Sequence, residues 1–163
     1  MRNGNRPLSA TMLALAVLGC AAASQEPAAE PRTVTRPAEM ARSTFELRPV
    51  LEAPSAGALE LPDPEGVPLH LGEPAPVGET DIARVEIGPA ASSHQMVLLH
   101  FQPAAAKRLY AFTAEHIGSR VAILVDGKIL MAPEVHESIG ATLAINPAYS
   151  EDDIVELAQR LAP

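Results

Sequence analysis

The side chains that could catalyse a reaction or bind a metal ion are scattered along this 163-residue chain. The five histidines are His70, His94, His100, His116 and His136. Metal sites built on one helix or strand repeat their ligands at fixed short spacings, as in HExxH, and these histidines show no such spacing. We therefore predict no metal ion and no cofactor, and structural or solvated roles for the histidines.

One polar cluster, made of Glu134, His136 and Glu137, could carry acid/base or metal chemistry. Catalysis would also need a nucleophile or an oxyanion donor, and the sequence identifies neither for this cluster. The Ser-Ser-His run at 92–94 and Ser138 lack a nucleophile elbow, and the glycines form no phosphate loop. We predict no catalytic residue and no enzyme, although a triad can assemble from distant positions.

The single cysteine, Cys20, ends a segment with the layout of a secretory signal peptide. Two arginines form a basic start, and residues 8–18 are an apolar stretch too short to span a bilayer as a stable helix. The end of this segment, Val-Leu-Gly-Cys at 17–20, resembles the lipobox of bacterial lipoproteins, whose thiol receives a diacylglyceryl group before cleavage. We predict a lipoprotein signal peptide over 1–19 and lipidation of Cys20. The alternative is an ordinary signal peptide with Cys20 near its cleavage site.

The chain is acidic, with 12 basic and 20 acidic residues and a formal net charge of −8 at pH 7. Cleavage before Cys20 would remove two arginines and leave a net charge of about −10. Nucleic-acid phosphates and anionic lipid surfaces repel such a protein. We therefore predict no nucleic-acid partner and a membrane link through the N-terminal lipid. The expected location is the cell envelope, on a bacterial membrane facing the periplasm or the exterior.

Composition divides the rest of the chain into a tether and a folded domain. Residues 20–43 contain hardly any large apolar side chain, so they cannot bury enough surface to offset the entropy of ordering. We predict a flexible tether over 20–43 and one domain over 44–163. Within the domain, residues 52–79 contain six prolines and are expected to be partly irregular, with a short extended piece at 67–71.

Hydrophobic alternation and apolar runs predict the strands of the domain. They are expected at 44–51, 82–87, 95–101, 121–125, 128–131 and 141–145. The run at 95–101 is nearly all apolar, which favours a central strand covered on both faces. Asp126 and Gly127 separate the fourth and fifth strands, and this pair favours the two positive φ angles of a type I′ hairpin turn.

Two helices are predicted, at residues 103–117 and at the C-terminus. Pro103 can begin the first helix and Gly118 can end it. Its expected apolar face consists of Ala106, Leu109, Tyr110, Thr113 and Ile117. Ser150 and Asp153 can form a capping box for the last helix, with Ile154, Leu157, Ala158 and Leu161 as its apolar stripe. The order of elements predicts an α+β fold with an antiparallel or mixed sheet and two helices packed on one face.

The predicted hairpin is part of a longer pattern. The pattern comprises Phe112 and Thr113, Ile117 and Gly118, the run Val-Ala-Ile-Leu-Val-Asp-Gly-Lys at 121–128, and Ala132 and Pro133. It resembles the head subdomain in the first periplasmic domain of SecD and SecDF export proteins, which carries an Ala-Ile-Val-Leu-Asp-Gly hairpin and a Ser-Ala-Pro-like turn. The resemblance covers residues 45–161 and is strongest over 101–139. Asn146 and Pro147 depart from it, because the family more often has glycine there.

The resemblance implies a binding role. In the family, the head is thought to contact emerging polypeptide while transmembrane carboxylates couple movement to proton flow. No apolar stretch after the signal peptide is long enough to span a bilayer, so proton-driven export by this protein alone is not expected. We expect a non-enzymatic envelope lipoprotein that binds polypeptide or an envelope protein, as an accessory to protein export. The hairpin edge and residues 132–140 are the first surfaces to test, because an exposed strand edge can pair with a peptide.

Three other functions fit the sequence. A small-molecule-binding lipoprotein would hold its ligand between the sheet and the loops, in a closed apolar cavity with convergent polar groups. An envelope hydrolase would place a serine or glutamate beside a histidine in a cleft. The third is a structural module without a partner of its own.

Overall fold

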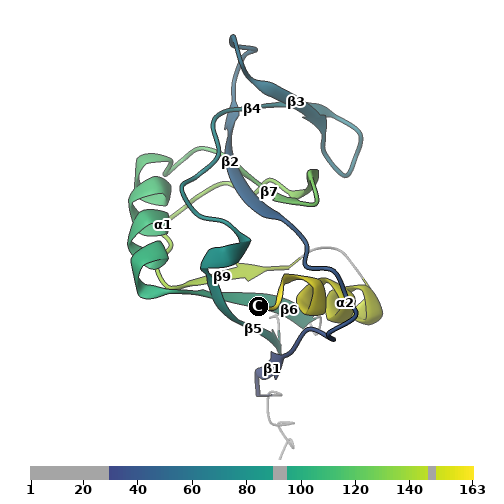
Figure 1. Ribbon diagram of the computed structural model, residues 1–163. Helices are drawn as coiled ribbons and strands as arrows, with labels where there is room; N and C mark the ends of the chain where they lie inside the picture. Colours follow the sequence, from purple (N-terminus) through teal and green to yellow (C-terminus); the bar gives the residue numbers. More distant parts are fainter. Residues whose placement is uncertain (1–29, 90–94, 147–149) are drawn as a thin grey trace, which may run out of the picture.

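The computed structural model describes residues 30–89, 95–146 and 150–163 (Figure 1). The strands are β1 (Arg32–Val34), β2 (Phe45–Leu51), β3 (Leu59–Pro62), β4 (Pro68–Leu71), β5 (Ile82–Pro89), β6 (Gln95–Phe101), β7 (Val121–Val125), β8 (Lys128–Met131) and β9 (Thr142–Ile145). The helices are α1 (Pro103–Glu115) and α2 (Glu151–Leu161), and a short 3-10 helix, η1 (Glu79–Asp81), precedes β5. All six predicted strands and both predicted helices are present.

The strands form two antiparallel sheets. The four-stranded sheet has the order β1-β5-β6-β9, and the five-stranded sheet has the order β3-β4-β2-β7-β8. The second sheet is curled, since β3 at one edge contacts β8 at the other. The α+β prediction is confirmed, with two sheets where one was expected.

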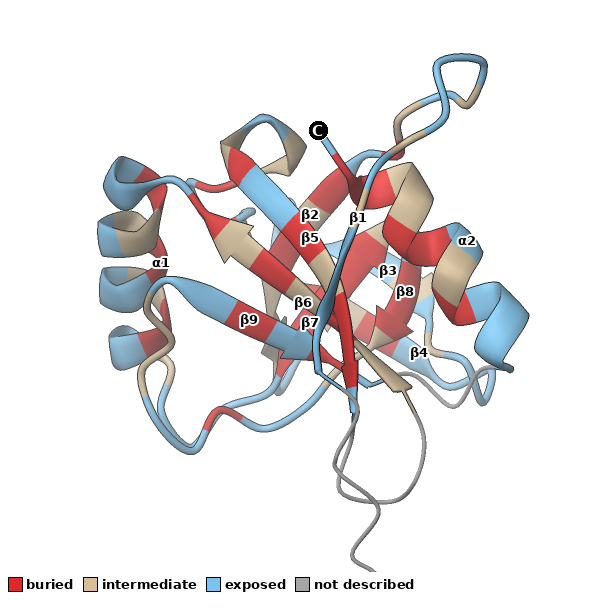
Figure 2. Cartoon of the chain, turned by 90° about the horizontal axis from the view of Figure 1, so that it is seen from below, coloured by how far each residue is buried: buried red, intermediate tan, exposed pale blue. Residues whose placement is uncertain are grey.

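The main core lies on the inner face of the four-stranded sheet (Figure 2). Along β6, Val97, Leu99 and Phe101 are buried, whereas the alternate residues are half-buried. The expectation that β6 is covered on both faces is therefore wrong, because no described helix or strand packs as a layer on its other face. A smaller cluster lies on the outer face of the five-stranded sheet, where Leu71 packs with Leu124.

Both helices contribute to this core and lie at opposite sides of it (Figure 1). The Ser150–Asp153 capping box and the apolar stripe of α2 are confirmed. The expected face of α1 is partly wrong, since Tyr110 and Ile117 are each 54% exposed. The buried residues are Ala105, Leu109 and Thr113. Thr113 fixes this orientation, because its hydroxyl donates to the Leu109 carbonyl (2.9 Å) and accepts from the Ile139 amide (2.8 Å).

Two segments expected to be irregular contain regular structure. Within the expected tether, β1 pairs with β5, so residues 32–34 lie on the domain. This pairing uses backbone groups and needs no large apolar side chain. In the proline-rich segment, β3 and β4 form a hairpin whose turn is closed by the Asp63 carboxylate, which accepts from two backbone amides. Its prolines at 62 and 68 face each other at the strand ends, where they interrupt little of the ladder.

The β7–β8 hairpin has the predicted turn. Asp126 and Gly127 have φ angles of 49° and 73°, as a type I′ turn requires. The Asp126 carboxylate accepts from the Ser43 hydroxyl (2.9 Å) and the Thr44 amide (3.0 Å), and it pairs with Arg160 of α2. These bonds fix the hairpin tip between the start of β2 and the last helix.

Candidate functional site

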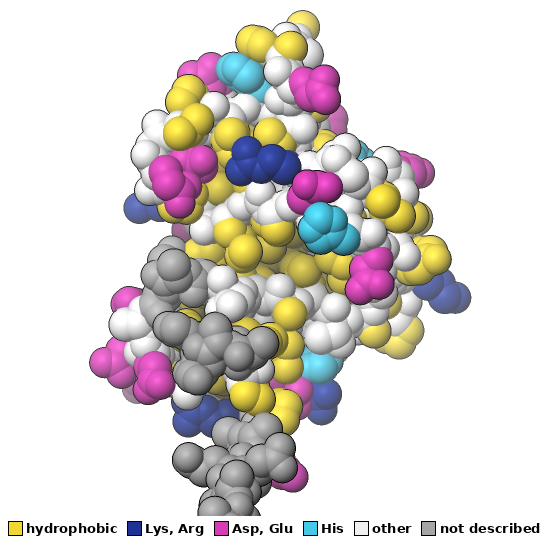
Figure 3. Space-filling view, turned by 180° about the vertical axis from the view of Figure 1, so that it is seen from behind, with side chains coloured by type: hydrophobic (Ala, Val, Ile, Leu, Met, Phe, Trp, Pro, Cys, Tyr) yellow, Lys and Arg dark blue, Asp and Glu magenta, His cyan; other side chains and the backbone are white. Residues whose placement is uncertain are grey.

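An apolar groove lies between strand β9 and the inner face of β2 and β7. Its volume is about 320 Å³. Its apolar lining consists of Leu47, Val121, Ile123, Val135, Ile139 and Leu143, together with Pro133 and Ala144. Figure 3 views the molecule from behind relative to Figure 1 and shows an apolar hollow that opens to solvent near the middle of that side. We call this site the groove.

Residues 133–139 form one wall of the groove and are held in place by backbone hydrogen bonds. The Val135 carbonyl accepts from the Gly118 amide (2.8 Å), and the Val135 amide donates to the Ser119 carbonyl (2.9 Å). The Val121 amide donates to the Pro133 carbonyl (2.9 Å). The segment is therefore fixed to the end of α1 and the start of β7, and the Val135 side chain is buried.

The opposite wall is a free strand edge. β9 is the last strand of its sheet, and within the described ranges no strand pairs with its outer side. The Phe101 amide donates to the Ala141 carbonyl (2.9 Å), and β6 and β9 continue in this register. Antiparallel pairs alternate between bonded and non-bonded, so the backbone N–H and C=O groups of Thr142 and Ala144 point away from β6. Both residues line the groove.

The predicted polar cluster lies at the border of the groove. Glu134, His136 and Glu137 all line it, and His136 Nδ1 is 3.7 Å from Glu134 Oε1. The two side chains are 81% and 54% exposed, so water screens this pair. Among the residues that the structure describes, no three His, Cys, Asp or Glu side chains gather as a metal ion would require.

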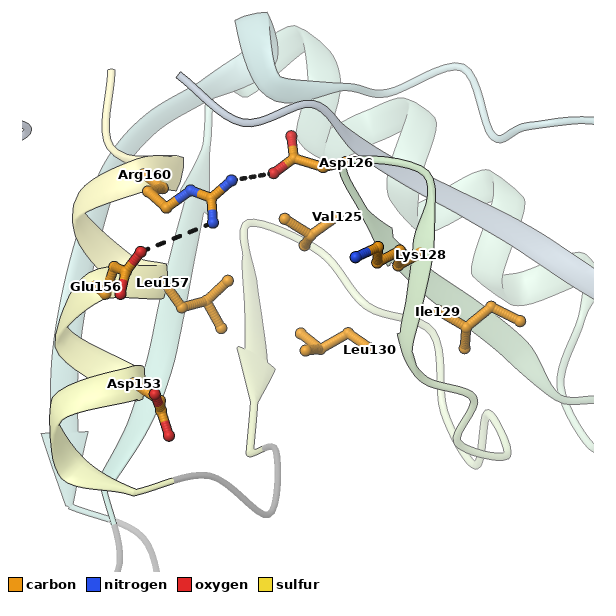
Figure 4. Close-up of a pocket in the computed structure, with 9 residues that line it drawn as sticks. All are labelled: Val125, Asp126, Lys128, Ile129, Leu130, Asp153, Glu156, Leu157 and Arg160. Atoms are coloured by element: carbon orange, nitrogen blue, oxygen red, sulfur yellow. Dashed lines mark hydrogen bonds and ion pairs between the residues drawn. The ribbon is translucent and has the colours of Figure 1, made fainter. Parts of the chain in front are cut away.

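A second cavity lies between β8 and α2 (Figure 4). Its volume is about 490 Å³, and its lining is more ionic than that of the groove. Arg160 pairs there with Asp126 and with Glu156 (3.8 Å), and Asp153 accepts from the Ser150 hydroxyl (2.6 Å). Because these groups already serve the hairpin and the cap of α2, the cavity is a weaker candidate for binding.

Two further histidines in the described part of the chain have local partners. His116 Nδ1 lies 2.7 Å from the Phe112 carbonyl, and His70 lies 3.5 Å from Glu60. Cys20 and the Ser-Ser-His run at 92–94 lie outside the described residues. Ser138 precedes Ile139 in the wall of the groove and is half-buried.

Among the described residues, His100 forms a chain of polar contacts that resembles a catalytic relay. Its Nε2 lies 2.8 Å from Glu86 Oε2, and its Nδ1 lies 3.1 Å from Thr142 Oγ1. The Glu86–His100 pair lies on the outer face of the four-stranded sheet and lines neither the groove nor the second cavity. Thr142, the third member of this chain of contacts, lines the groove.

Burial raises the pKa of Glu86, but the His100 hydrogen bond and the Arg84 charge outweigh this effect and lower it below its ordinary value of 4.5. A lowered carboxylate pKa stabilises the fold above about pH 4.5, and this contribution is lost as the pH falls through the folded pKa. We expect Glu86→Gln to lower the melting temperature at about pH 7, and the difference from wild type to shrink towards about pH 3.

Thermal unfolding of both proteins across this pH range is the measurement. Glu65→Gln, which removes an exposed carboxylate from the β3–β4 turn, is the control. A difference between Glu86→Gln and wild type that stays constant with pH would contradict this role of the pair.

The sequence identified only part of the groove. Residues 132–140 were expected to form a binding surface, and they form one wall. The hairpin was also expected to offer an edge, and β8 is indeed the last strand of its sheet, but β8 contacts β3 and lines the second cavity. The strand edge at the groove comes from β9 instead. The sequence did carry one signal for β9. Thr142 and Ala144 alternate with Leu143 and Ile145, which indicates a strand with one buried face.

No helix within residues 30–89, 95–146 and 150–163 has the length and apolar content needed to cross a bilayer.

Comparisons with known proteins agree on one family. A curated relative, the protein translocase subunit SecD of Acidaminococcus fermentans, is 35% identical over 81 residues, which is 50% of this chain and 18% of that protein. A solved structure of SecDF, described as a membrane component that enhances protein export, has a TM-score of 0.60 and 25% identity. It covers 74% of this chain and 62% of its own.

A second solved structure, SecDF in its super-membrane-facing form, has the same TM-score of 0.60 and 25% identity. This chain spans 19% of that protein, so it corresponds to a small part of its larger relatives. The family model of the SecDF P1 head subdomain matches residues 56–162, which include both walls of the groove. This chain belongs to the SecDF P1 head subdomain family.

Proposed function

We propose that this protein is a non-enzymatic accessory to protein export that binds extended polypeptide in the groove. Family membership supports the connection to export, since one solved relative is described as enhancing it. The observation that carries the proposal is the free edge of β9 beside an apolar surface. An extended chain could donate to and accept from the outward backbone groups of Thr142 and Ala144.

Apolar side chains of the bound polypeptide would then enter the groove. Alternate residues of an extended chain point to the same side, so every second side chain would contact the surface formed by Val121, Ile123 and Val135. Backbone pairing is independent of sequence, whereas the apolar lining favours chains with large apolar residues. This combination suits a protein that meets many different unfolded chains.

Site-specific photocrosslinking in intact cells tests the proposal. A photoreactive residue at position 144 lies in the groove, and a matched probe at position 110 lies on the exposed face of α1. We expect crosslinks to chains in transit from position 144 and few from position 110. Equal yields from the two positions, or no crosslinked polypeptide from position 144, would contradict the proposal.

We also propose that Cys20 carries a lipid that anchors the protein to a membrane of the cell envelope. The support is the Val-Leu-Gly-Cys sequence after a signal-like apolar stretch. Each buried methylene contributes about 0.8 kcal/mol, so several acyl chains would hold the protein on a bilayer. We expect Cys20→Ser to abolish incorporation of radiolabelled palmitate and to shift the protein from the membrane fraction to the soluble fraction. Persistent labelling of the variant would contradict lipidation at Cys20.

A small-molecule ligand is the second candidate, because the groove volume of about 320 Å³ falls within the range of ligand sites. Its openness and the free edge of β9 favour polypeptide instead. Native mass spectrometry of protein purified from cells separates the two candidates. A single bound compound of constant mass that blocks peptide binding would favour the small molecule.

A further inference from the structure

The charges around the groove suggest which polypeptides it prefers. Glu134 and Glu137 line the groove, and both are exposed residues on its border. Within the described residues, His136 lies 3.7 Å from Glu134, a pair that is ionic only when the histidine is protonated, and no lysine or arginine pairs with either Glu134 or Glu137. In the second cavity, by contrast, Arg160 already pairs with two carboxylates.

Arg120 adjoins this border but has no ion pair with Glu134. Arg120 forms a backbone bridge with Glu134, but its guanidinium donates to the Ala132 carbonyl (2.9 Å). Arg120 lines a different cavity, of about 430 Å³, and is absent from the lining of the groove. Figure 3 shows a histidine and acidic side chains along one border of the hollow, with a basic side chain next to them. The groove therefore presents an apolar surface with negative charge along one side.

We propose that the groove prefers polypeptide segments in which an apolar stretch has lysine or arginine at one end, with the cationic end against Glu134 and Glu137. This inference rests on the proposed function and names its substrate class. The apolar stretch lies along β9, and the flanking cation replaces water at the two carboxylates. The net charge of −8 adds a weaker, longer-range attraction for the same segments.

The expected preference is modest, because the two carboxylates are exposed. Exposed ion pairs each contribute enough to change affinity about two- to fivefold, so a cationic end should strengthen binding by about two- to tenfold over a neutral one. The preference should decrease with salt, since the Debye length falls from about 10 Å at 0.1 M to about 3 Å at 1 M.

Two sets of three labelled peptides, one set for each end of the peptide, test the inference against the purified full-length chain. They share one apolar segment of about eight residues and differ at one end, which carries lysines, glutamines or glutamates, with each end tested in turn. Fluorescence anisotropy at low and high salt gives the affinities. We expect the order lysine, glutamine, glutamate from tightest to weakest, with the differences reduced at high salt.

Two charge variants identify the source of the preference. Glu134→Lys combined with Glu137→Lys should reverse the order of the three peptides. The matched control, Glu65→Lys combined with Glu73→Lys, makes the same change of net charge at exposed positions that line neither the groove nor the second cavity, and it should keep the order.

The possible failures are distinguishable. If all three peptides bind equally well, the charge preference is wrong and polypeptide binding stands. If both double variants change the order to the same extent, the preference comes from net charge and the assignment to Glu134 and Glu137 is wrong. If no peptide binds to the wild-type chain, the proposed function itself is contradicted.

Discussion

Replacing Ala144 with proline should weaken polypeptide binding at least about tenfold, equivalent to about 1.4 kcal/mol, while the protein stays folded. The Ala144 amide points away from β6, so proline removes no bond of the β6–β9 ladder. It removes one donor from the free edge and places a ring where a pairing strand would lie. The affinity of the full-length chain for an apolar extended peptide is the measurement.

Ala144→Val is the matched control, because it enlarges the same side chain and keeps the amide. Valine also favours extended backbone, so this variant should bind peptide about as well as wild type. Leu143→Pro provides a contrast, since the Leu143 amide points towards β6 and its loss should destabilise the sheet. Unchanged peptide affinity in a folded Ala144→Pro variant would contradict pairing at β9.

The largest effect on stability is expected from Leu99→Ala, which should lower the free energy of unfolding by about 2–5 kcal/mol. Leu99 is 0% exposed in the main core, and its strand lies between β5 and β9. Truncation would leave a cavity in the core that both helices help to form, and the surrounding residues can close it only in part. Urea unfolding of wild type and variant, with an unchanged m-value, gives the difference between their free energies of unfolding directly.

Leu98→Ala is the control on the opposite face of the same strand. Leu98 is half-buried on the outer face of the sheet, so its truncation should cost less than half as much. Equal losses for Leu98 and Leu99 would mean that the inner face of the four-stranded sheet is not the main core. The proposed groove depends on the position of this core, because Leu143 of β9 both lines the groove and packs in the core.

The sequence predicted best the elements whose signals are local. The Asp126–Gly127 turn and the Ser150–Asp153 cap each depend on residues within four positions of one another, and both were correct. The face of α1 was partly wrong because it depends on a distant contact, between Thr113 and Ile139. The extended piece expected at 67–71 is β4, but β3 and the pairing of the two strands were missed, because their prolines stand at strand ends, a position that composition alone does not reveal.

The groove could be predicted only in part for the same reason. Residues 132–140 were visible as a polar segment after a hairpin. The second wall of the groove comes from β9, and whether β9 is an edge strand depends on the order of the strands in the sheet. A short alternating run predicts a strand and not its neighbours. The carboxylates of Glu134 and Glu137 likewise indicate a binding preference only once they are known to lie beside the apolar surface of β7.

Amide hydrogen exchange at β9 tests the central claim most directly. In the free protein, the amides of Thr142 and Ala144 should exchange quickly, because they point outward, whereas those of Leu143 and Ile145 bond to β6. Addition of an apolar extended peptide should slow exchange at Thr142 and Ala144 and leave Leu143 and Ile145 unchanged. Saturation with a bound peptide that leaves Thr142 and Ala144 exchanging as fast as before would contradict strand pairing in the groove.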